Sequence, residues 1–455
     1  MTTALAAVLA YMLVQFGIGV WASRRIKTED DYLVAGRRLG YPLAIFSLFA
    51  TWFGAETIVG SAGTVVRDGV SLASAEPFGY GLCLILMGLV FAVPLWRRRL
   101  TTLADLFRTR YSPTTERVAA TILIPSSILW AAAQVRAFGH VLASGSTLEV
   151  EAAVALAAGF TILYTVFGGL LVDAITDFIQ GAVLVLGLVV LLGAVLHALG
   201  GVQGAAVAVA ASDQIRLAGS GGASPLAVLE AWAIPVCGSV IATELVARII
   251  ATRSPEVARR SALTAGGLYL AVGVIPVFIG LVGVRLVPGL ADPEQLLPAV
   301  ARELLPTLLY ALFAGGLISA ILSTVDSTLL VSSGLLSHNV IVPLLRTPDE
   351  RLKVRIARAG VLVFGLAAYG LALHADGVFA LVEQASAFGG AGALVTVAFG
   401  LFTTIGGAKT ATATMVGGVA AYGAGLAIGL PYPFLASLAA SLAIYIAGAT
   451  LEAAV

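Results

Sequence analysis

Thirteen apolar segments of about 20 residues recur along the 455-residue chain, and this feature limits its fold more than any other. About 20 apolar residues in a helix cross the hydrocarbon core of a bilayer. Only 11% of the residues are charged, too few to cover a water-soluble protein of this size. We therefore expect an all-α polytopic membrane protein. The expected spans cover residues 3–22, 42–66, 74–96, 117–142, 149–171, 174–199, 224–250, 261–285, 306–335, 358–374, 378–403, 410–429 and 433–452.

The positive charges predict an orientation for these spans. If the first span enters from outside, 21 of the 26 Lys and Arg residues fall in cytoplasmic loops and four in external loops, while Arg136 remains within a span. This is the bias of the positive-inside rule. We expect a multi-pass protein of the cell membrane, such as the bacterial inner membrane, with its N-terminus outside and its C-terminus in the cytoplasm.

Several other classes of protein are excluded by the sequence. It contains no metalloprotease, serine-hydrolase or P-loop motif, so neither an enzyme nor an ATP-driven pump is expected. A net charge of +1 gives no reason to expect a nucleic-acid partner, and no loop is long enough for a further soluble domain. We expect no organic cofactor and no obligate protein partner besides the lipid bilayer.

Two segments interrupt the helical pattern in the middle of a span. They are FATWFGAET (49–57) and AIPVCGSVIATE (233–244), which contains Pro235 and Gly238. The two breaks stand five spans apart, so spans 2–6 and 7–11 can form two five-helix repeats of opposite orientation. Such paired breaks are typical of a transporter's central site, because unwound backbone groups can line a cavity there. The alternative is that Gly and Pro are simply common in membrane helices.

The segment LISAILSTVDSTLLVSS has unusually many oxygen-bearing side chains for a membrane helix. On a helical wheel, Ser323, Thr324 and Ser327 share a face with Ala320, and Asp326 lies at its margin. Hydroxyls and carbonyls freed by an interrupted helix provide the oxygen ligands that a hard monovalent cation needs. The alternative is hydrogen bonding of Ser and Thr to carbonyls one turn earlier. An acid within the membrane favours a functional role.

Five motifs resemble those of the sodium:solute symporter family, and they occur in the family's order. The resemblance extends from about residue 30 to about residue 400. It implies a LeuT-type fold of two inverted five-helix repeats, with one extra helix before them and two after. The motifs are DYLVAGRRLG (31–40), SLFATWFGAETIVGSAG (47–63), TTLADLFRTRY (101–111), YTVFGGLLVDAITDFIQ (164–180) and ISAILSTVDSTLL (318–330).

The resemblance divides the chain into four parts. Residues 1–41 would form the extra N-terminal helix and a cytoplasmic loop, and residues 42–223 the first repeat, helices 2–6, with an external loop. Residues 224–409 would form the second repeat, helices 7–11, and residues 410–455 the two C-terminal helices. A protein of this family is expected to import a small organic solute together with sodium by alternating access.

The resemblance also implies ion ligands. Some members of the family hold a second sodium ion, whose ligands here would be Asp177, Asp326 and Ser327, with Ser323. Without the resemblance, Asp177 is explained as an acid near the start of its helix. Asp326 stands where members with the second site can carry a serine. The main sodium site would comprise the carbonyls of Ala50, Phe53 and Ala320 and the hydroxyls of Ser323 and Thr324.

The solute is predicted mainly from Arg136. An unpaired Arg within a span is costly, so Arg136 should meet an acid or an anionic substrate. In the family's sialic acid transporters, an Arg in this helix holds a carboxylate, so we expect a carboxylate-bearing solute, either an organic acid or an amino-acid-like molecule. The alternative is a structural ion pair with Glu56, Glu76 or Glu383. The candidate substrate-binding residues are Thr57, Glu76, Gln134, Arg136 and Glu383.

Three questions stay open from the sequence. A proton-coupled carrier of the same fold could relay protons through Asp177 and Asp326. A sodium sensor or channel-like protein that transports no solute is a rival of a different class. Glu244 and Arg248, four residues apart, could simply pair with each other.

Overall fold

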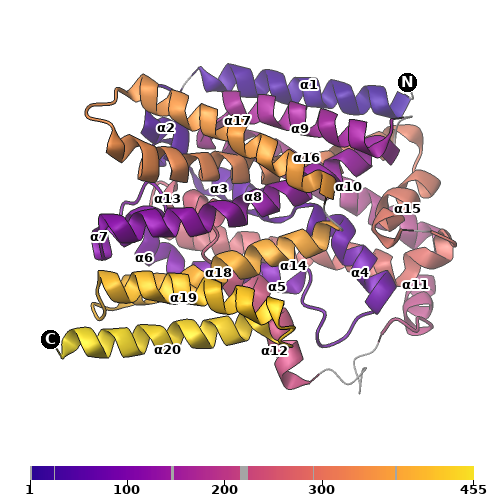
Figure 1. Ribbon diagram of the computed structural model, residues 1–455. Coiled ribbons are helices and arrows are strands. Elements are labelled where there is room, and N and C mark those ends of the chain that lie inside the picture. The colour runs from indigo at the N-terminus through magenta and orange to yellow at the C-terminus, as the bar shows by residue number, and fades with distance from the viewer. Residues whose placement is uncertain are drawn as a thin grey trace.

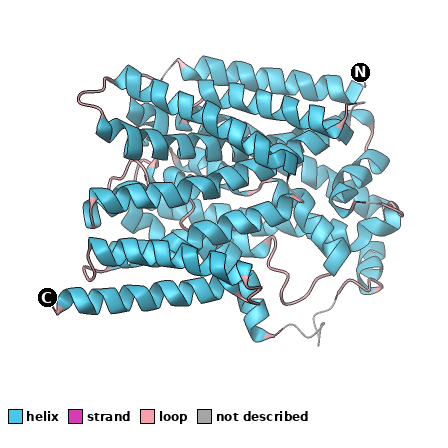
Figure 2. Cartoon of the chain, in the orientation of Figure 1, coloured by secondary structure: helices cyan, strands magenta, loops and turns pink. Residues whose placement is uncertain are grey.

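The computed structural model describes residues 3–24, 26–144, 148–215, 224–290, 292–374 and 377–454. Within these ranges the secondary structure is helical, as Figure 2 shows, and β pairing is limited to two isolated bridges, Leu39 with Thr252 and Val70 with Ile215. The expectation of an all-α protein is therefore confirmed.

Nine of the described helices are long and apolar enough to cross a membrane, and two bent helix pairs raise this number to as many as eleven. The other two expected spans correspond to α1 (Thr3–Ser23) and α19 (Ala408–Ala427). The total of thirteen stays a prediction. The nine are the continuous α5–η3–α6 (Phe78–Leu86, Met87–Phe91, Ala92–Arg97), α8 (Pro113–Ser144), α9 (Val150–Phe167), α10 (Leu170–Ala198), α14 (Pro255–Leu286), α16 (Thr307–Gly334) with its continuation η6 (Leu335–Ile341) and η7 (Val342–Leu344), α17 (Glu350–His374), α18 (Val378–Phe402) and α20 (Pro433–Ala453).

The two bent pairs lie at the two interruptions expected from the sequence. The first pair bends by 56° and the second by 42°. Phe53, with φ −91° and ψ 64°, ends the first helix of its pair. In the second pair, Pro235 cannot donate a backbone hydrogen bond, which weakens the helix there. The first pair is α3 (Tyr41–Trp52) with η2 (Glu56–Gly60) and α4 (Ser61–Asp68), and the second is α12 (Pro225–Ala233) and η4 (Ile234–Gly238) with α13 (Thr243–Ile250).

Short helices connect the spans at both ends of the bundle. Where α12 and α14 begin, Ser224 and Ser254 accept hydrogen bonds from backbone N–H groups of the first turn, and a proline follows each serine. Both features favour helix initiation. The remaining short elements are α2 (Glu29–Val34), η1 (Ala35–Arg37), α7 (Ala104–Arg110), α11 (Gly201–Ala210), η5 (Pro293–Gln295) and α15 (Leu296–Leu304).

Helix α16 forms the centre of the bundle. It packs against α10, α8, α17 and α3, and every residue from Phe313 to Gly334 is buried. In the view of Figure 1, α1, α9 and α17 lie along one side of the bundle, and α19 and α20 lie along the opposite side. A helix buried on all faces can carry hydroxyl groups without exposing them to lipid, which makes α16 suited to a polar site.

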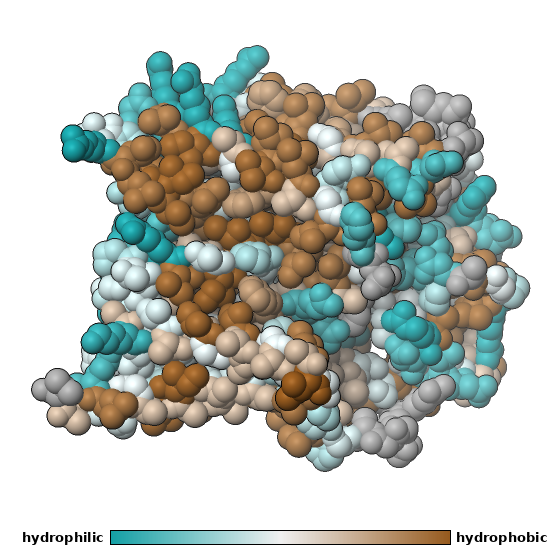
Figure 3. Space-filling view, viewed as in Figure 1, coloured by the Kyte–Doolittle hydropathy of each residue, from teal (hydrophilic) through white to brown (hydrophobic). Residues whose placement is uncertain are grey.

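The outer surface fits a membrane environment. Figure 3 shows a broad hydrophobic region across the middle of the molecule, with hydrophilic side chains gathered towards the two ends. The start of α1 and the end of α20 lie at these opposite ends (Figure 1). This is the arrangement expected for an odd number of spans, while the assignment of the N-terminal end to the outside stays a prediction.

Close backbone contacts fix the second broken helix against α18. A Cβ atom added at Gly390 of α18 would lie 2.5 Å from the Cα of Gly238 and 3.1 Å from its carbonyl oxygen. Only glycine allows this approach, because the neighbouring atoms are backbone and cannot rotate away. Small residues serve the same purpose between many membrane helices.

We expect Gly390→Ala to lower the free energy of unfolding by about 1–3 kcal/mol, because the added methyl group overpacks this contact. Thermal unfolding of the detergent-purified protein would measure the change. Gly370→Ala is the matched control, since no atom lies within 4 Å of a Cβ added at Gly370. Equal unfolding temperatures for the two variants would contradict the assignment.

Candidate functional site

The hydroxyl-rich face of α16 meets the end of α3 and the first third of α10. Thr324 Oγ1 lies 2.9 Å from the carbonyl oxygen of Thr51 and 3.0 Å from that of Ala320. The neighbouring Ser323 hydroxyl donates to the carboxylate of Asp177 in α10. Thr324 therefore forms the hydrogen bond one turn back that was the expected alternative. In addition, the Thr324 hydroxyl bonds α3 and the Ser323 hydroxyl bonds α10.

The break after α3 leaves backbone carbonyls beside these hydroxyls. Phe53 N donates to the carbonyl of Phe49 at 2.8 Å, which closes the last turn of α3. In the described part of the chain, no hydrogen bond ends at the carbonyl oxygen of Ala50 or Phe53, and both residues are fully buried. Buried carbonyls need a partner, so these two oxygens are available to a cation.

A buried ion cluster lies one turn further along α16. Arg248 Nη2 of α13 lies 2.6 Å from Asp173 Oδ2 and 3.0 Å from Asp177 Oδ2, and it donates to the hydroxyl of Ser327. Arg248 Nε also donates to Ser47 Oγ of α3 at 2.9 Å. The Arg248 side chain is fully buried. Paired and hydrogen-bonded on several sides, the guanidinium meets the conditions for a charge in the protein interior.

This cluster overturns one expectation and bears on a second, the second sodium site, which stays a prediction. Glu244 offers Arg248 its backbone carbonyl, at 3.4 Å, so the alternative pairing of their side chains is wrong. Asp177 and Ser327, two expected ligands of a second sodium, have a guanidinium as their partner. Asp326, the third, is buried, and its Oδ1 has no hydrogen-bond partner within the described ranges. Arg248 is one of the 21 basic residues expected in cytoplasmic loops, because α13 follows the break and ends near that loop.

A second polar group lies at the other side of the break in α3. Gln134 Nε2 of α8 donates to Glu56 Oε2 at 2.7 Å, and Gln134 Oε1 accepts from Ala55 N at 3.0 Å. Glu56 is fully buried, and its Oε1 has no hydrogen-bond partner in the described structure. The carboxylate folds back over Gly54, where a Cβ atom would lie 2.5 Å from Oε2. Glycine at position 54 is therefore required for this arrangement.

Thr57 links this group to a third acid. Its hydroxyl donates to Glu76 Oε1 at 3.1 Å and contacts the hydroxyl of Tyr269. Glu76 and Glu383 line the same cavity. The structure therefore brings Thr57, Glu76 and Gln134 of the predicted substrate site together, with Glu383 in the same cavity wall as Glu76.

These acids adjoin a cavity of about 230 Å³, which we call the outer cavity. Aromatic rings extend from it toward the end of α3: Tyr80 lies 6.0 Å from Trp130, which lies 5.3 Å from Trp52, centroid to centroid. The sequence analysis missed Trp130 and Tyr80, since single aromatic residues in apolar spans give no signal. The lining residues are Ser61, Thr64, Val65, Asp68, Gly69, Ser71, Ala73, Ser74, Ala75, Glu76, Tyr80, Ala231, Ile234, Pro235 and Glu383.

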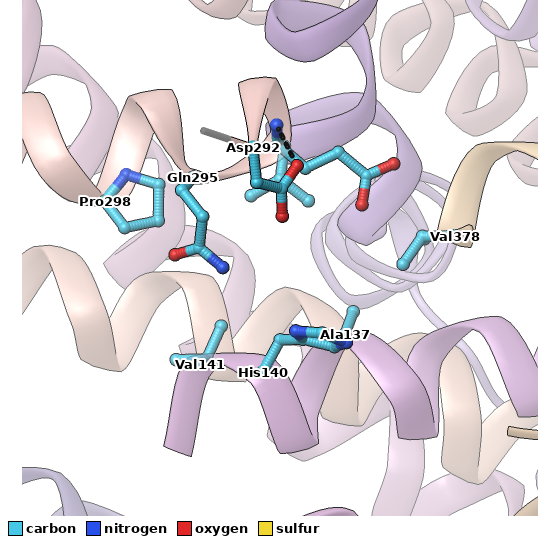
Figure 4. A pocket seen from close by; sticks show the side chains of 9 residues that line it. Ala137, His140, Val141, Asp292, Gln295, Pro298 and Val378 are labelled. Atoms are coloured by element: carbon cyan, nitrogen blue, oxygen red, sulfur yellow. Dashed lines mark hydrogen bonds between the residues drawn. The ribbon is translucent and has the colours of Figure 1, made fainter. Parts of the chain in front are cut away.

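Arg136 does not join this group. Its Nη1 donates to the carbonyl of Ala372 near the end of α17 at 3.2 Å, and within the described ranges it forms no ion pair. The next residues of α8, Ala137 and His140, line a separate cavity of about 30 Å³ facing Asp292 and the η5–α15 segment (Figure 4). The alternative ion pair of Arg136 with Glu56, Glu76 or Glu383 is therefore wrong for the described structure, whereas its role as a ligand of a solute carboxylate stays a prediction.

Comparison with known proteins agrees with the fold and these motifs. Residues 32–418 match the sodium:solute symporter family. The chain belongs to this family. The resemblance seen in the sequence is thereby confirmed, and the protein is a membrane transporter rather than an enzyme.

Several family members are similar over most of the chain. The sodium/pantothenate symporter of Escherichia coli (strain K12) is 26% identical over 462 residues, covering 97% of this chain and 95% of that protein. The high affinity choline transporter 1 of Homo sapiens is 27% identical over 401 residues, covering 83% and 69%. A Na⁺-coupled sialic acid symporter in a substrate-bound outward-open state has a similar fold, with a TM-score of 0.86, 20% identity, and coverage of 99% and 97%.

We expect Arg248→Met to lower the free energy of unfolding by about 3–5 kcal/mol, because Asp173 and Asp177 would stay buried without their positive partner. Thermal unfolding in detergent would measure the loss. Arg67→Met is the matched control: it breaks an exposed pair with Asp68, for which about 0–1 kcal/mol is expected.

The double variant Arg248→Met with Asp173→Asn should recover part of the lost stability, because it removes one of the unpaired charges. A single variant Arg248→Met as stable as the control would contradict the importance of the cluster.

Proposed function

We propose that this transporter imports a small organic solute into the cell together with sodium, by alternating access. The observation that carries the proposal is the contact between Thr324 of α16 and the Thr51 carbonyl in the last turn of α3. It brings the hydroxyls of α16 beside the unpaired carbonyls of a broken helix. Membership of the sodium:solute symporter family supports sodium as the coupling ion.

The proposed main sodium site consists of the carbonyls of Ala50, Phe53 and Ala320 and the hydroxyls of Ser323 and Thr324. These five oxygens suit a hard monovalent cation, which prefers oxygen to sulfur or imidazole ligands. All five are neutral groups, and the carbonyls of Ala50 and Phe53 have no hydrogen-bond partner within the described ranges, whereas Thr324 bonds the carbonyls of Thr51 and Ala320. The Ser323 hydroxyl also donates a hydrogen bond to the Asp177 carboxylate. This carboxylate lies directly behind the proposed ligands, and its negative charge favours a cation at the site.

The proposed coupling runs through the break in α3. Sodium bound between α3 and α16 would hold residues 53–56 in one conformation, and the same residues carry Glu56 at the solute side. A solute that prefers this conformation binds more tightly when sodium is present, and the reverse holds equally. We assign the two moving units to the repeats expected from the sequence, residues 42–223 and 224–409, in a cell membrane with the N-terminus outside.

We further propose that a single sodium ion is carried. Arg248 supplies a positive charge at Asp177 and Ser327, where the family resemblance would have put a second ion. A guanidinium and a sodium ion cannot share the same oxygens without strong repulsion. A second sodium at Asp177, Asp326 and Ser327 would need Arg248 to leave.

The solute need not carry the predicted carboxylate. That prediction depended on Arg136, whose guanidinium binds the Ala372 carbonyl. The relatives do not decide the matter, because pantothenate carries a carboxylate and choline a positive charge. A proton-coupled carrier of the same fold is the second candidate, favoured by the unpartnered Oδ1 of Asp326.

We expect Ser323→Ala and Thr324→Ala to weaken sodium binding about ten- to a hundredfold, as for the loss of one hydrogen bond or ligand to a charged group. The measurement is thermal unfolding in sodium chloride against potassium chloride at matched ionic strength. A hundredfold excess of sodium over Kd should stabilise the native protein by about 2.7 kcal/mol.

Thr328→Ala is the matched control on the same helix, because the Thr328 hydroxyl bonds only the Val325 carbonyl of α16 in the described structure. Undiminished stabilisation by sodium in both Ser323→Ala and Thr324→Ala would contradict the site. Equal unfolding of the unaltered protein in the two salts, with stabilisation at low pH, would favour the proton-coupled carrier.

Sodium binding to the unaltered protein should saturate at one ion per chain. Equilibrium binding of radioactive sodium to the purified protein, with Ser323→Ala as the variant that weakens the main site, would count the ions. Two ions per chain would contradict the assignment of Arg248 as the resident cation at Asp177.

A further inference from the structure

The buried acids of this protein fall into two groups. Most of them have a positive partner or bind backbone N–H groups. Asp105 and Glu116 pair with Arg108, Asp173 and Asp177 pair with Arg248, Glu29 lies beside His338 and Lys353, and Glu230 accepts from the first N–H groups of α20.

The second group has no ion pair within the described ranges and comprises Glu56, Glu76, Glu244 and Asp326. Glu56 and Glu76 are the two that lie toward the outer cavity. Both are buried, and their side-chain partners are the neutral Gln134 and Thr57. An unpaired buried carboxylate is costly, and a site that keeps two of them is prepared for a positive partner from outside the chain.

The outer cavity shares this electrostatic character. Its lining contains three acids, Asp68, Glu76 and Glu383, and no Lys, Arg or His. The nearest arginine in sequence, Arg67, is more than half exposed and pairs with Asp68 at 3.3 Å. An anionic solute entering through this cavity would meet only like charges, whereas a cation would be attracted along it.

Aromatic rings complete the environment. Tyr80 lines the outer cavity, and Trp130 behind it also lines a smaller cavity at the second helix break together with Ser386 and Gly238. The indole Nε1 of Trp130 is buried and has no hydrogen-bond partner within the described ranges. Faces of Trp and Tyr attract ammonium groups, and aromatic walls beside carboxylates are the usual surroundings of bound organic cations.

From these observations we infer that the solute carries an ammonium centre, as an organic cation or a zwitterion, which enters through the outer cavity and binds near Glu56, against the rings of Tyr80 and Trp130. This inference rests on the proposed transport function and names its substrate class. Glu76 and Glu383 attract the positive charge of the solute into the cavity, and Glu56, at the break in α3, is the acid that pairs with the ammonium group. The outer cavity is below the roughly 300–1,000 Å³ of drug-sized sites, so the solute is small.

The test is ligand-induced stabilisation of the purified full-length protein in sodium chloride. The probes are choline as a permanent cation, glycine betaine and proline as zwitterions, lactate and pantothenate as anions, and glucose as a neutral solute, all at millimolar concentration. We expect at least one ammonium-bearing probe to raise the unfolding temperature, and lactate, pantothenate and glucose to have no effect. Stabilisation only by an anionic or neutral probe, or by no ammonium-bearing probe, would overturn the inference.

Two variants test the assigned residues. Glu56→Gln keeps the size of the side chain and should weaken binding of the ammonium-bearing probe about ten- to a hundredfold, and Trp130→Leu about three- to thirtyfold. Glu303→Gln, at an exposed position of α15, is the matched control and should bind normally. Unchanged affinity in Glu56→Gln would overturn its role.

The sodium response of the same samples separates this inference from the proposed function. Sodium should stabilise Glu56→Gln and Trp130→Leu without any solute, which also verifies that both variants are folded. If sodium stabilises the protein but no ammonium-bearing probe does, the substrate class fails while sodium coupling stands. If sodium itself has no effect on the unaltered protein, the proposed function fails.

Discussion

A guanidinium buried inside the membrane region is the interaction on which the rest of the arrangement depends. Arg248 reaches from α13 to two acids of α10, a hydroxyl of α16 and a hydroxyl of α3. Each partner must stay in place, because a buried charge that loses its partner costs several kcal/mol. The second oxygen of Asp177 then accepts from Ser323, so the geometry of the proposed sodium site follows from the ion cluster behind it.

The break in α3 joins two sites of opposite chemical character. The Thr51 carbonyl in the last turn of α3 accepts from Thr324 of α16, whereas Glu56, a few residues later, accepts from Gln134 of α8. Three residues separate α3 from η2, too few to let one side move independently of the other. In the proposed mechanism, an ion on the first side and a solute on the second would select the same backbone conformation, and this would couple their binding.

The sequence predicted those features that depend on local chemistry. The apolar spans, the two breaks and the hydroxyl face of α16 follow from residue type and helical spacing, and they are where they were expected. The partners of Arg248 were out of reach, because Asp173 lies 75 residues away along the chain. Arg136 and Gln134 stand about 200° apart on a helix, so the two could not face one site. Only the packing of α8 in the structure shows that Gln134 is the residue that faces the break in α3.

The ion cluster also has a consequence for the order of synthesis. Helix α10, with Asp173 and Asp177, is made before α13, with Arg248. When α10 reaches the translocon, its acids have no counter-charge, and they acquire one only after the connecting segment and the broken α12–α13 pair have followed. The first half of the chain therefore cannot complete its packing until the second half is inserted, and until then it is expected to stay beside the translocon or bound to a chaperone. Its completion depends on one arginine from the later half.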